Sequence, residues 1–99
     1  MQSHYAEQFE RDMSCTEVEW LRWLPAAIGA LKHQQIAGQA VVQFEPGALR
    51  LSWRELEPLR IAMVRLPRLR VEFVFQGLDA AQRHGFMQRF DLYLQRGGG

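Results

Sequence analysis

The sequence predicts an α+β fold: a four-stranded antiparallel sheet (a meander) with N-terminal and C-terminal helices packed on one face, as a two-layer sandwich. Apolar and polar residues alternate at period two through residues 39–76, which places successive side chains on opposite faces of strands. Helix signals flank this region on both sides. With no repeat or linker-like segment, residues 1–99 are expected to form one small domain. Residues 97–99 are expected to be a flexible tail.

Residues 1–14 precede the first clear signal and are expected to be either a frayed lead or an amphipathic helix. Thr16 and Glu19 then match a capping box, in which each side chain satisfies a free backbone N–H of the other residue. A helix should therefore begin here. Proline disrupts a helix interior, so Pro25 predicts a break or bend near Leu24.

Four strands are expected, over residues 39–44, 49–54, 60–66 and 69–75. The Pro46-Gly47 and Pro67-Arg68 pairs are expected to form the turns of two hairpins. After the last strand, Asp79 is a suitable N-cap for a C-terminal helix. Its apolar residues at helical spacing are Phe86, Met87, Phe90 and Leu94.

A two-residue loop at Pro67-Arg68 would fix the register of the last two strands. Val64 would then oppose Val71, and opposed residues share a face. The expected inner face consists of Ala40, Val42, Phe44, Leu49, Leu51, Trp53, Ala62, Val64, Leu66, Leu69, Val71, Phe73 and Phe75. On the outer face, Arg65 would lie directly across from Arg70. A slip of one residue would exchange the two faces of the third strand.

The outer face is the predicted contact surface, because arginines there surround a small apolar island of Ile61, Met63 and Val74. The alternative interpretation is that the outer face is an ordinary solvated sheet face with single exposed apolar residues. The predicted interaction residues are Arg50, Arg54, Ile61, Met63, Arg65, Arg70 and Val74. Trp20 and Trp23, three residues apart, are expected to be core residues, or a second contact point where one is exposed.

The composition excludes several classes of protein. The apolar content of 47% and charged content of 23% are those of a globular domain, and no apolar run is long enough to span a membrane. The absence of a signal segment and the single cysteine, Cys15, favour a cytoplasmic location. Eleven of the twelve basic residues are arginine, as in GC-rich bacterial genomes. His4, His33, His84 and Cys15 lack metal-ligand spacing, and neither a metal nor another cofactor is expected.

The charge is uneven, with −3 over residues 1–47 and +4 over residues 48–99. The favoured function is therefore a non-enzymatic protein–protein interaction module that binds a partner with acidic groups. A second copy could supply them, from Glu7, Glu10, Asp12, Glu17 and Glu19. One alternative is binding of RNA or single-stranded DNA through the same arginines. Another is a small-ligand carrier or enzyme with a pocket between the helices and the sheet.

Overall fold

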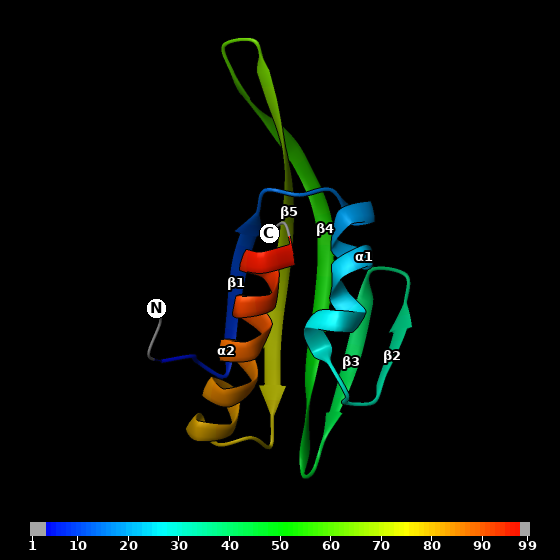
Figure 1. Ribbon diagram of the computed structural model, residues 1–99, viewed down its shortest axis with the longest axis vertical. Coiled ribbons are helices and arrows are strands. Elements are labelled where there is room, and N and C mark those ends of the chain that lie inside the picture. The colour runs from blue at the N-terminus through cyan, green and yellow to red at the C-terminus, as the bar shows by residue number, and fades with distance from the viewer. Residues whose placement is uncertain (1–3, 98–99) are drawn as a thin grey trace.

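The structure, a computed structural model, describes residues 4–97. Its elements are β1 (Gln8–Met13), α1 (Glu17–Ile28), β2 (His33–Ile36), β3 (Gln39–Phe44), β4 (Gly47–Ile61), β5 (Val64–Gln76) and α2 (Ala80–Gly97), as drawn in Figure 1. The start of the expected lead, residues 1–3, and the end of the expected tail, residues 98–99, lie outside the described residues.

The strands form one antiparallel sheet in the order β1-β5-β4-β3-β2, which confirms the α+β class and the antiparallel sheet. The prediction of four strands was wrong, because the sheet has five. Residues 8–13 do not form a lead or a helix but the edge strand β1, whose Phe9 lies opposite Phe73 of β5. Exposure alternates from Gln8 to Met13, with Phe9, Arg11 and Met13 partly buried, as in a half-buried strand. The short strand β2, at the other edge, was not predicted.

The prediction of a turn at Pro67-Arg68 was also wrong. The chain reverses at Ala62-Met63, so residues 47–61 form one long strand, β4, and residues 64–76 form β5. Ala62 has a φ of +53°, which a hairpin turn of two residues requires in its first position. Pro67 lies within β5, and Pro58 lies in a bulge of β4 between Leu56 and Leu59. Prolines are tolerated in strands where the pairing is irregular or at an edge.

The true turn changes which residues face the core. Val71 is buried as expected, but it opposes Trp53, while Val64 opposes Ile61 near the turn. Most of the expected inner-face residues are buried, namely Ala40, Val42, Leu49, Leu51, Trp53, Leu69, Val71, Phe73 and Phe75, and Phe44 is partly buried. Ala62, Val64 and Leu66 are exposed instead, which corrects their assignment to the core.

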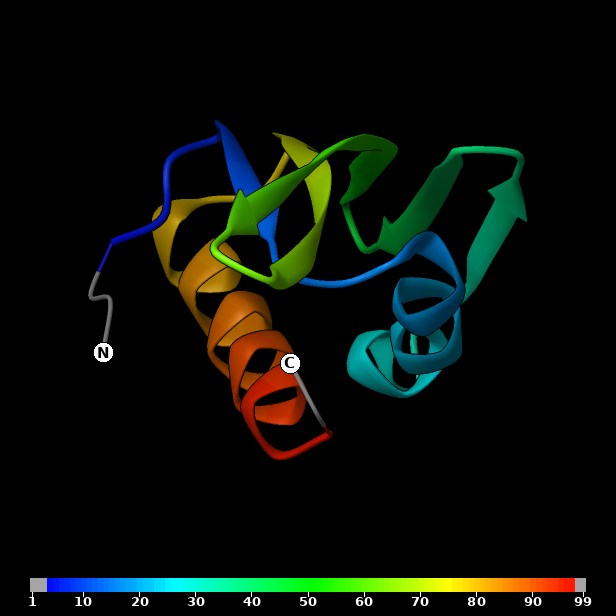
Figure 2. The same cartoon turned by 90° about the horizontal axis from the view of Figure 1, so that it is seen from above.

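Aromatic contacts join the helices to the sheet. Figure 2 shows both helices on the same side of the sheet, with α2 near β1 and β5 and α1 near β3 and β2. The ring centroids of Trp20 and Trp53 lie 5.6 Å apart, and those of Phe73 and Phe90 lie 5.8 Å apart. Phe9 stacks on Phe73 with a centroid distance of 4.7 Å. One cluster of buried residues therefore includes side chains of the sheet and of both helices.

Both helices begin as predicted. The Glu19 amide donates to the Thr16 hydroxyl at 3.2 Å, and the Thr16 amide donates to the Glu19 carboxylate at 2.9 Å, which confirms the capping box. The Gln82 amide donates to Asp79 at 2.8 Å at the start of α2. Of the expected break or bend near Leu24, the break was wrong, because α1 continues through Pro25. Burial of the next turn of α1 favours its continuation despite the missing hydrogen bond.

The central hairpin is longer than the strands that flank it. β1 pairs with β5 only over Leu69–Val74, and β3 pairs with β4 only over Gly47–Ser52. Beyond them, residues 56–68 form a two-stranded ribbon, here called the arm, which projects past both helices in Figure 1. The molecule measures 47 × 30 × 22 Å, and the arm lies along its longest axis.

Two leucines of β4 provide a direct test of this arrangement. Leu51 is 0% exposed in the core, whereas Leu59 is 47% exposed on the arm. We expect Leu51→Ala to lower the free energy of unfolding by about 2–5 kcal/mol, because it leaves a cavity. Leu59→Ala should change it by no more than about 0.5 kcal/mol. Urea denaturation of both variants at low protein concentration measures the difference, and equal losses would show that the arm packs against the body.

Candidate functional site

The structure divides the predicted contact residues between two places. Arg50, Arg54, Arg70 and Val74 lie on the outer face of the sheet, where Arg50 opposes Val74 and Arg54 opposes Arg70. Ile61, Met63 and Arg65 belong to the arm instead. Arg65 opposes Arg60, so the expected pair of Arg65 and Arg70 does not form. The expected island of Ile61, Met63 and Val74 does not form either, because Val74 lies near the far end of β5.

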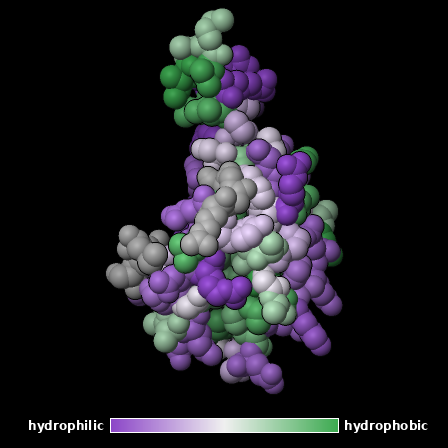
Figure 3. Space-filling view, viewed as in Figure 1, coloured by the Kyte–Doolittle hydropathy of each residue, from purple (hydrophilic) through white to green (hydrophobic). Residues whose placement is uncertain are grey.

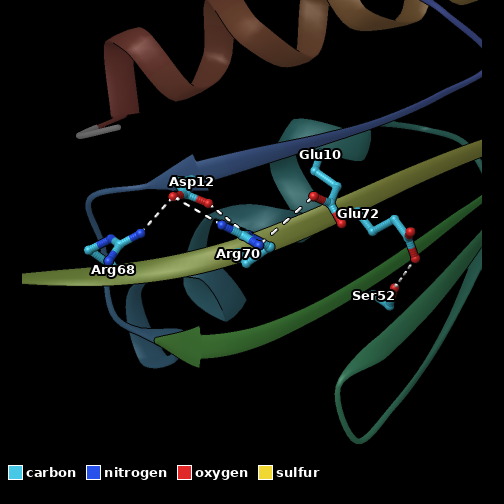
Figure 4. A network of polar contacts seen from close by, with 6 residues as sticks. All are labelled: Glu10, Asp12, Ser52, Arg68, Arg70 and Glu72. Atoms are coloured by element: carbon cyan, nitrogen blue, oxygen red, sulfur yellow. Dashed lines mark hydrogen bonds and ion pairs between the residues drawn. The ribbon is translucent and has the colours of Figure 1, made fainter. Parts of the chain in front are cut away.

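The outer face carries acidic residues that the predicted surface lacked. Asp12 of β1 lies beside Arg70, and Figure 4 shows its carboxylate between Arg68 and Arg70. Arg68 Nη2 lies 2.8 Å from Asp12 Oδ2, and Arg70 Nε lies 2.9 Å from Asp12 Oδ1. Glu10 adds a longer contact, at 4.0 Å from Arg70 Nη1. Arg68 and Arg70 therefore both form ion pairs with Asp12 of the same chain.

The same contacts set the ionisation of Asp12. Hydrogen bonds from Arg70 and Arg68 stabilise the carboxylate and lower the pKa of Asp12 to about 2, against the opposing effect of desolvation. They also relieve the repulsion between Arg70 and Arg54, which lie directly across from each other. Sequence reasoning missed this role of Asp12 because residues 8–13 were not assigned to a strand, although Glu10 and Asp12 alternate with Phe9 and Arg11.

Exposed apolar side chains concentrate on the arm. Leu59 opposes Leu66 and Ile61 opposes Val64, so these four side chains share one side of the ribbon, here called the apolar arm face. Their exposed fractions are 47%, 36%, 56% and 54%, and Met63 at the turn is 99% exposed. Figure 3 shows hydrophobic residues gathered on one side of the projecting end and hydrophilic ones on the other. Arg60 and Arg65 lie across from each other on that other side.

The two tryptophans differ in exposure. Trp20 is fully buried against Trp53 and Phe90, so it cannot contact a partner. Trp23 is half-buried and lines a cleft of about 710 Å³. The cleft is lined by Tyr5, Arg11, Asp12, Met13, Ser14, Cys15, Trp23, Gln88, Asp91, Leu92, Leu94 and Gln95. Its volume falls in the range of small-molecule pockets.

Three polar side chains of this cleft, Tyr5, Arg11 and Asp91, bind one another. Arg11 donates to both carboxylate oxygens of Asp91, at 2.6 and 3.0 Å, and the Tyr5 hydroxyl donates to Asp91 at 2.7 Å. The Arg11 guanidinium also lies 5.4 Å from the ring centroids of Phe9 and Phe73. Burial and the bond to Asp91 raise the pKa of Tyr5, so its hydroxyl stays protonated. The network ties β1 to α2 and leaves these groups engaged with each other.

Cys15 is an unreactive thiol at the same cleft. It is the only cysteine and is 2% exposed. Burial, with the nearby charges of Glu19 and Glu55, raises the pKa of Cys15 to about 11, so almost no thiolate forms near neutral pH. Within residues 4–97, no group of three or more histidine, cysteine, aspartate or glutamate side chains is placed to hold a metal ion.

Comparison with known proteins gives no family. No protein-family model matches the chain, and no curated protein matches it significantly. Among the helices described, none is long and apolar enough to cross a membrane.

The ion pairs of Asp12 can be measured directly. The folded-state pKa of Asp12 lies below its ordinary value of 3.8. Its contribution to stability is therefore present above pH 3.8 and is lost as the pH falls from 3.8 towards about 2. We expect NMR titration of the carboxyl carbon to give a pKa near 2, and Arg70→Gln to raise it towards 3.8. Arg50→Gln, on the same face, should leave it unchanged. An ordinary pKa of Asp12 in the native chain would contradict the network.

Proposed function

We propose that the chain is a non-enzymatic protein–protein interaction module and that the arm is its contact surface. The observation that carries this proposal is the clustering of exposed apolar residues. Of nine large hydrophobic residues exposed among the described residues, five lie between positions 59 and 66. The other four, Val18, Ile36, Leu92 and Tyr93, are distributed over α1, β2 and α2. Contiguous apolar surface of this kind is typical of interaction sites.

The charge of the arm indicates the chemistry of the partner. Between Pro58 and Pro67 the arm carries Arg60 and Arg65 and no acidic residue. Within residues 4–97, neither arginine lies within ion-pair distance of a carboxylate. A partner that covers the arm would best combine apolar side chains with carboxylates at the rim. Arginine beside apolar surface is a common composition of binding hot spots.

The acidic N-terminal segment is a poor source of those carboxylates. Asp12 already pairs with Arg68 and Arg70 in its own chain. Glu19 accepts the Thr16 amide, and Glu17 accepts the Trp53 indole N–H at 2.8 Å. Self-association through this segment, as the sequence suggested, would have to break these bonds.

The cleft favours a non-enzymatic role. Arg11 and Tyr5 both donate hydrogen bonds to Asp91, and Cys15 is held as a neutral thiol. An acid–base or nucleophilic site instead needs a group whose pKa is tuned near the working pH. The cleft remains the place where a ligand carrier would hold its ligand, beside Trp23 and Leu92.

Binding of RNA or single-stranded DNA is the second candidate function. It is supported by Arg50, Arg54, Arg60 and Arg65, for which the described part of the chain provides no ion pair. It is weakened by Glu10, Asp12 and Glu72, which place negative charge on the same outer face.

The turn of the arm offers a selective chemical test. Since Cys15 is buried with a raised pKa, a thiol introduced by Met63→Cys can be labelled alone with a photo-crosslinker that carries a thiol-reactive group. We expect this label, at a position that is 99% exposed, to form covalent adducts with protein in an extract of the source cell. Gel electrophoresis and mass spectrometry identify the adducts, including adducts between two copies of the chain.

The matched control is Tyr93→Cys, labelled in the same way on α2, where the side chain is 36% exposed. Protein adducts at position 63 that position 93 does not give would support the proposal. Equal adducts at both positions, or none at position 63, would refute it. Adducts at position 63 that a nuclease removes would favour the nucleic-acid alternative.

A further inference from the structure

We propose that the occupant of the apolar arm face is a second copy of this chain, bound through the same face in a two-fold symmetric dimer. This inference rests on the proposed function of the arm. Leu59, Ile61, Val64 and Leu66 of one copy would pack against the same four residues of the other. A two-fold interface of this type uses one surface patch twice and closes on itself.

The distribution of charge makes the face compatible with itself. The two rows of the ribbon on this face, Leu59 with Leu66 and Ile61 with Val64, contain no charged side chain. Arg60 and Arg65 lie on the opposite side, so in a face-to-face pair they stay in water. Two copies can therefore meet without burying an unpaired charge, which would cost several kcal/mol. The carboxylates that the charge of the arm favours in a partner would lie on the opposite side, beside Arg60 and Arg65, and not on the apolar arm face.

The area of the exposed surface is sufficient for a specific but weak dimer. Together with Met63, the four residues of the apolar arm face are exposed by between 36% and 99%. Full burial of these five side chains, Met63 included, would remove roughly 1,000 Å² from solvent in a face-to-face pair, which is the lower limit for a specific interface. We expect a dissociation constant in the micromolar range.

Covering the apolar arm face would also stabilise the ribbon and protect it from aggregation. An isolated two-stranded hairpin is marginally stable in water, and within residues 4–97 no third strand pairs with the arm, which projects past both helices. An exposed apolar ribbon is prone to open-ended aggregation, and a closed pair removes that surface from solution. Pro58, Pro67 and the bulge at the base of the arm interrupt the regular edge, which favours packing through side chains over strand addition.

Sedimentation equilibrium of the full chain, from about 1 to 500 µM, tests the inference. The native chain should form dimers within this range. Ile61→Asp and Ile61→Lys each place like charges on the two facing surfaces and should raise the dissociation constant more than tenfold. An equal mixture of these two variants should restore the dimer, because the carboxylate of one then faces the ammonium of the other. Val18→Asp, on the exposed surface of α1, is the control and should leave the dimer intact.

Folding of the variants is checked by circular dichroism, and Met63→Lys is a second disruptive variant at a position where no packing can be lost. A native chain that stays monomeric throughout would overturn the inference. So would a dimer that tolerates Ile61→Asp, or a mixture that stays monomeric. None of these results contradicts the proposed function if photo-crosslinking at position 63 still captures other proteins. That function fails separately, when position 63 captures nothing.

Discussion

The pairing of β4 with β5 is the interaction on which the rest of the structure depends. These two strands form the centre of the sheet, so β1 joins one side of the pair and β3 the other. Their inner residues, among them Leu51, Trp53 and Phe73, provide the surface on which the helices pack. The same pairing continues beyond the flanking strands and there produces the arm. Core and projecting surface thus come from one hairpin, and its register decides which apolar residues belong to each.

β1 determines what the outer face can do. By adding Glu10 and Asp12 beside β5, it converts a surface of arginines into one of mixed charge, with Arg68 and Arg70 already paired. Such a face suits a solvated sheet better than a strong anion-binding site. The same strand places Arg11 on the inner side, where it binds Asp91 of α2. Most of the large apolar side chains that are exposed among the described residues lie on the arm. The proposed contact surface is therefore placed there.

Local patterns in the sequence predicted much of the body. The capping box at Thr16, the apolar stripe of α2 and the inward residues of β3 and of the first half of β4 follow from spacing alone. The position of the central turn could not be predicted in this way. Pro67-Arg68 is the stronger turn signal, whereas Ala62-Met63, where the chain reverses, carries neither glycine nor asparagine. With the turn misplaced, Val64 and Leu66 were assigned to the core. Once the strand runs through Pro67, its alternation places Val64 and Leu66 on the face opposite Leu69 and Val71, away from the helices. How far the helices cover the sheet cannot be read from this alternation. That depends on tertiary packing, as does the partnership of Asp12 with residues more than fifty positions away.

The register of the central hairpin is therefore the most direct point of test. In nuclear Overhauser spectra of the isotopically labelled chain, the structure predicts cross-strand contacts between Ile61 and Val64, between Leu59 and Leu66, and between Trp53 and Val71. Contacts of Val64 with Val71 and of Leu66 with Leu69 would place the turn at Pro67-Arg68. They would remove the arm, and with it the surface assigned to binding.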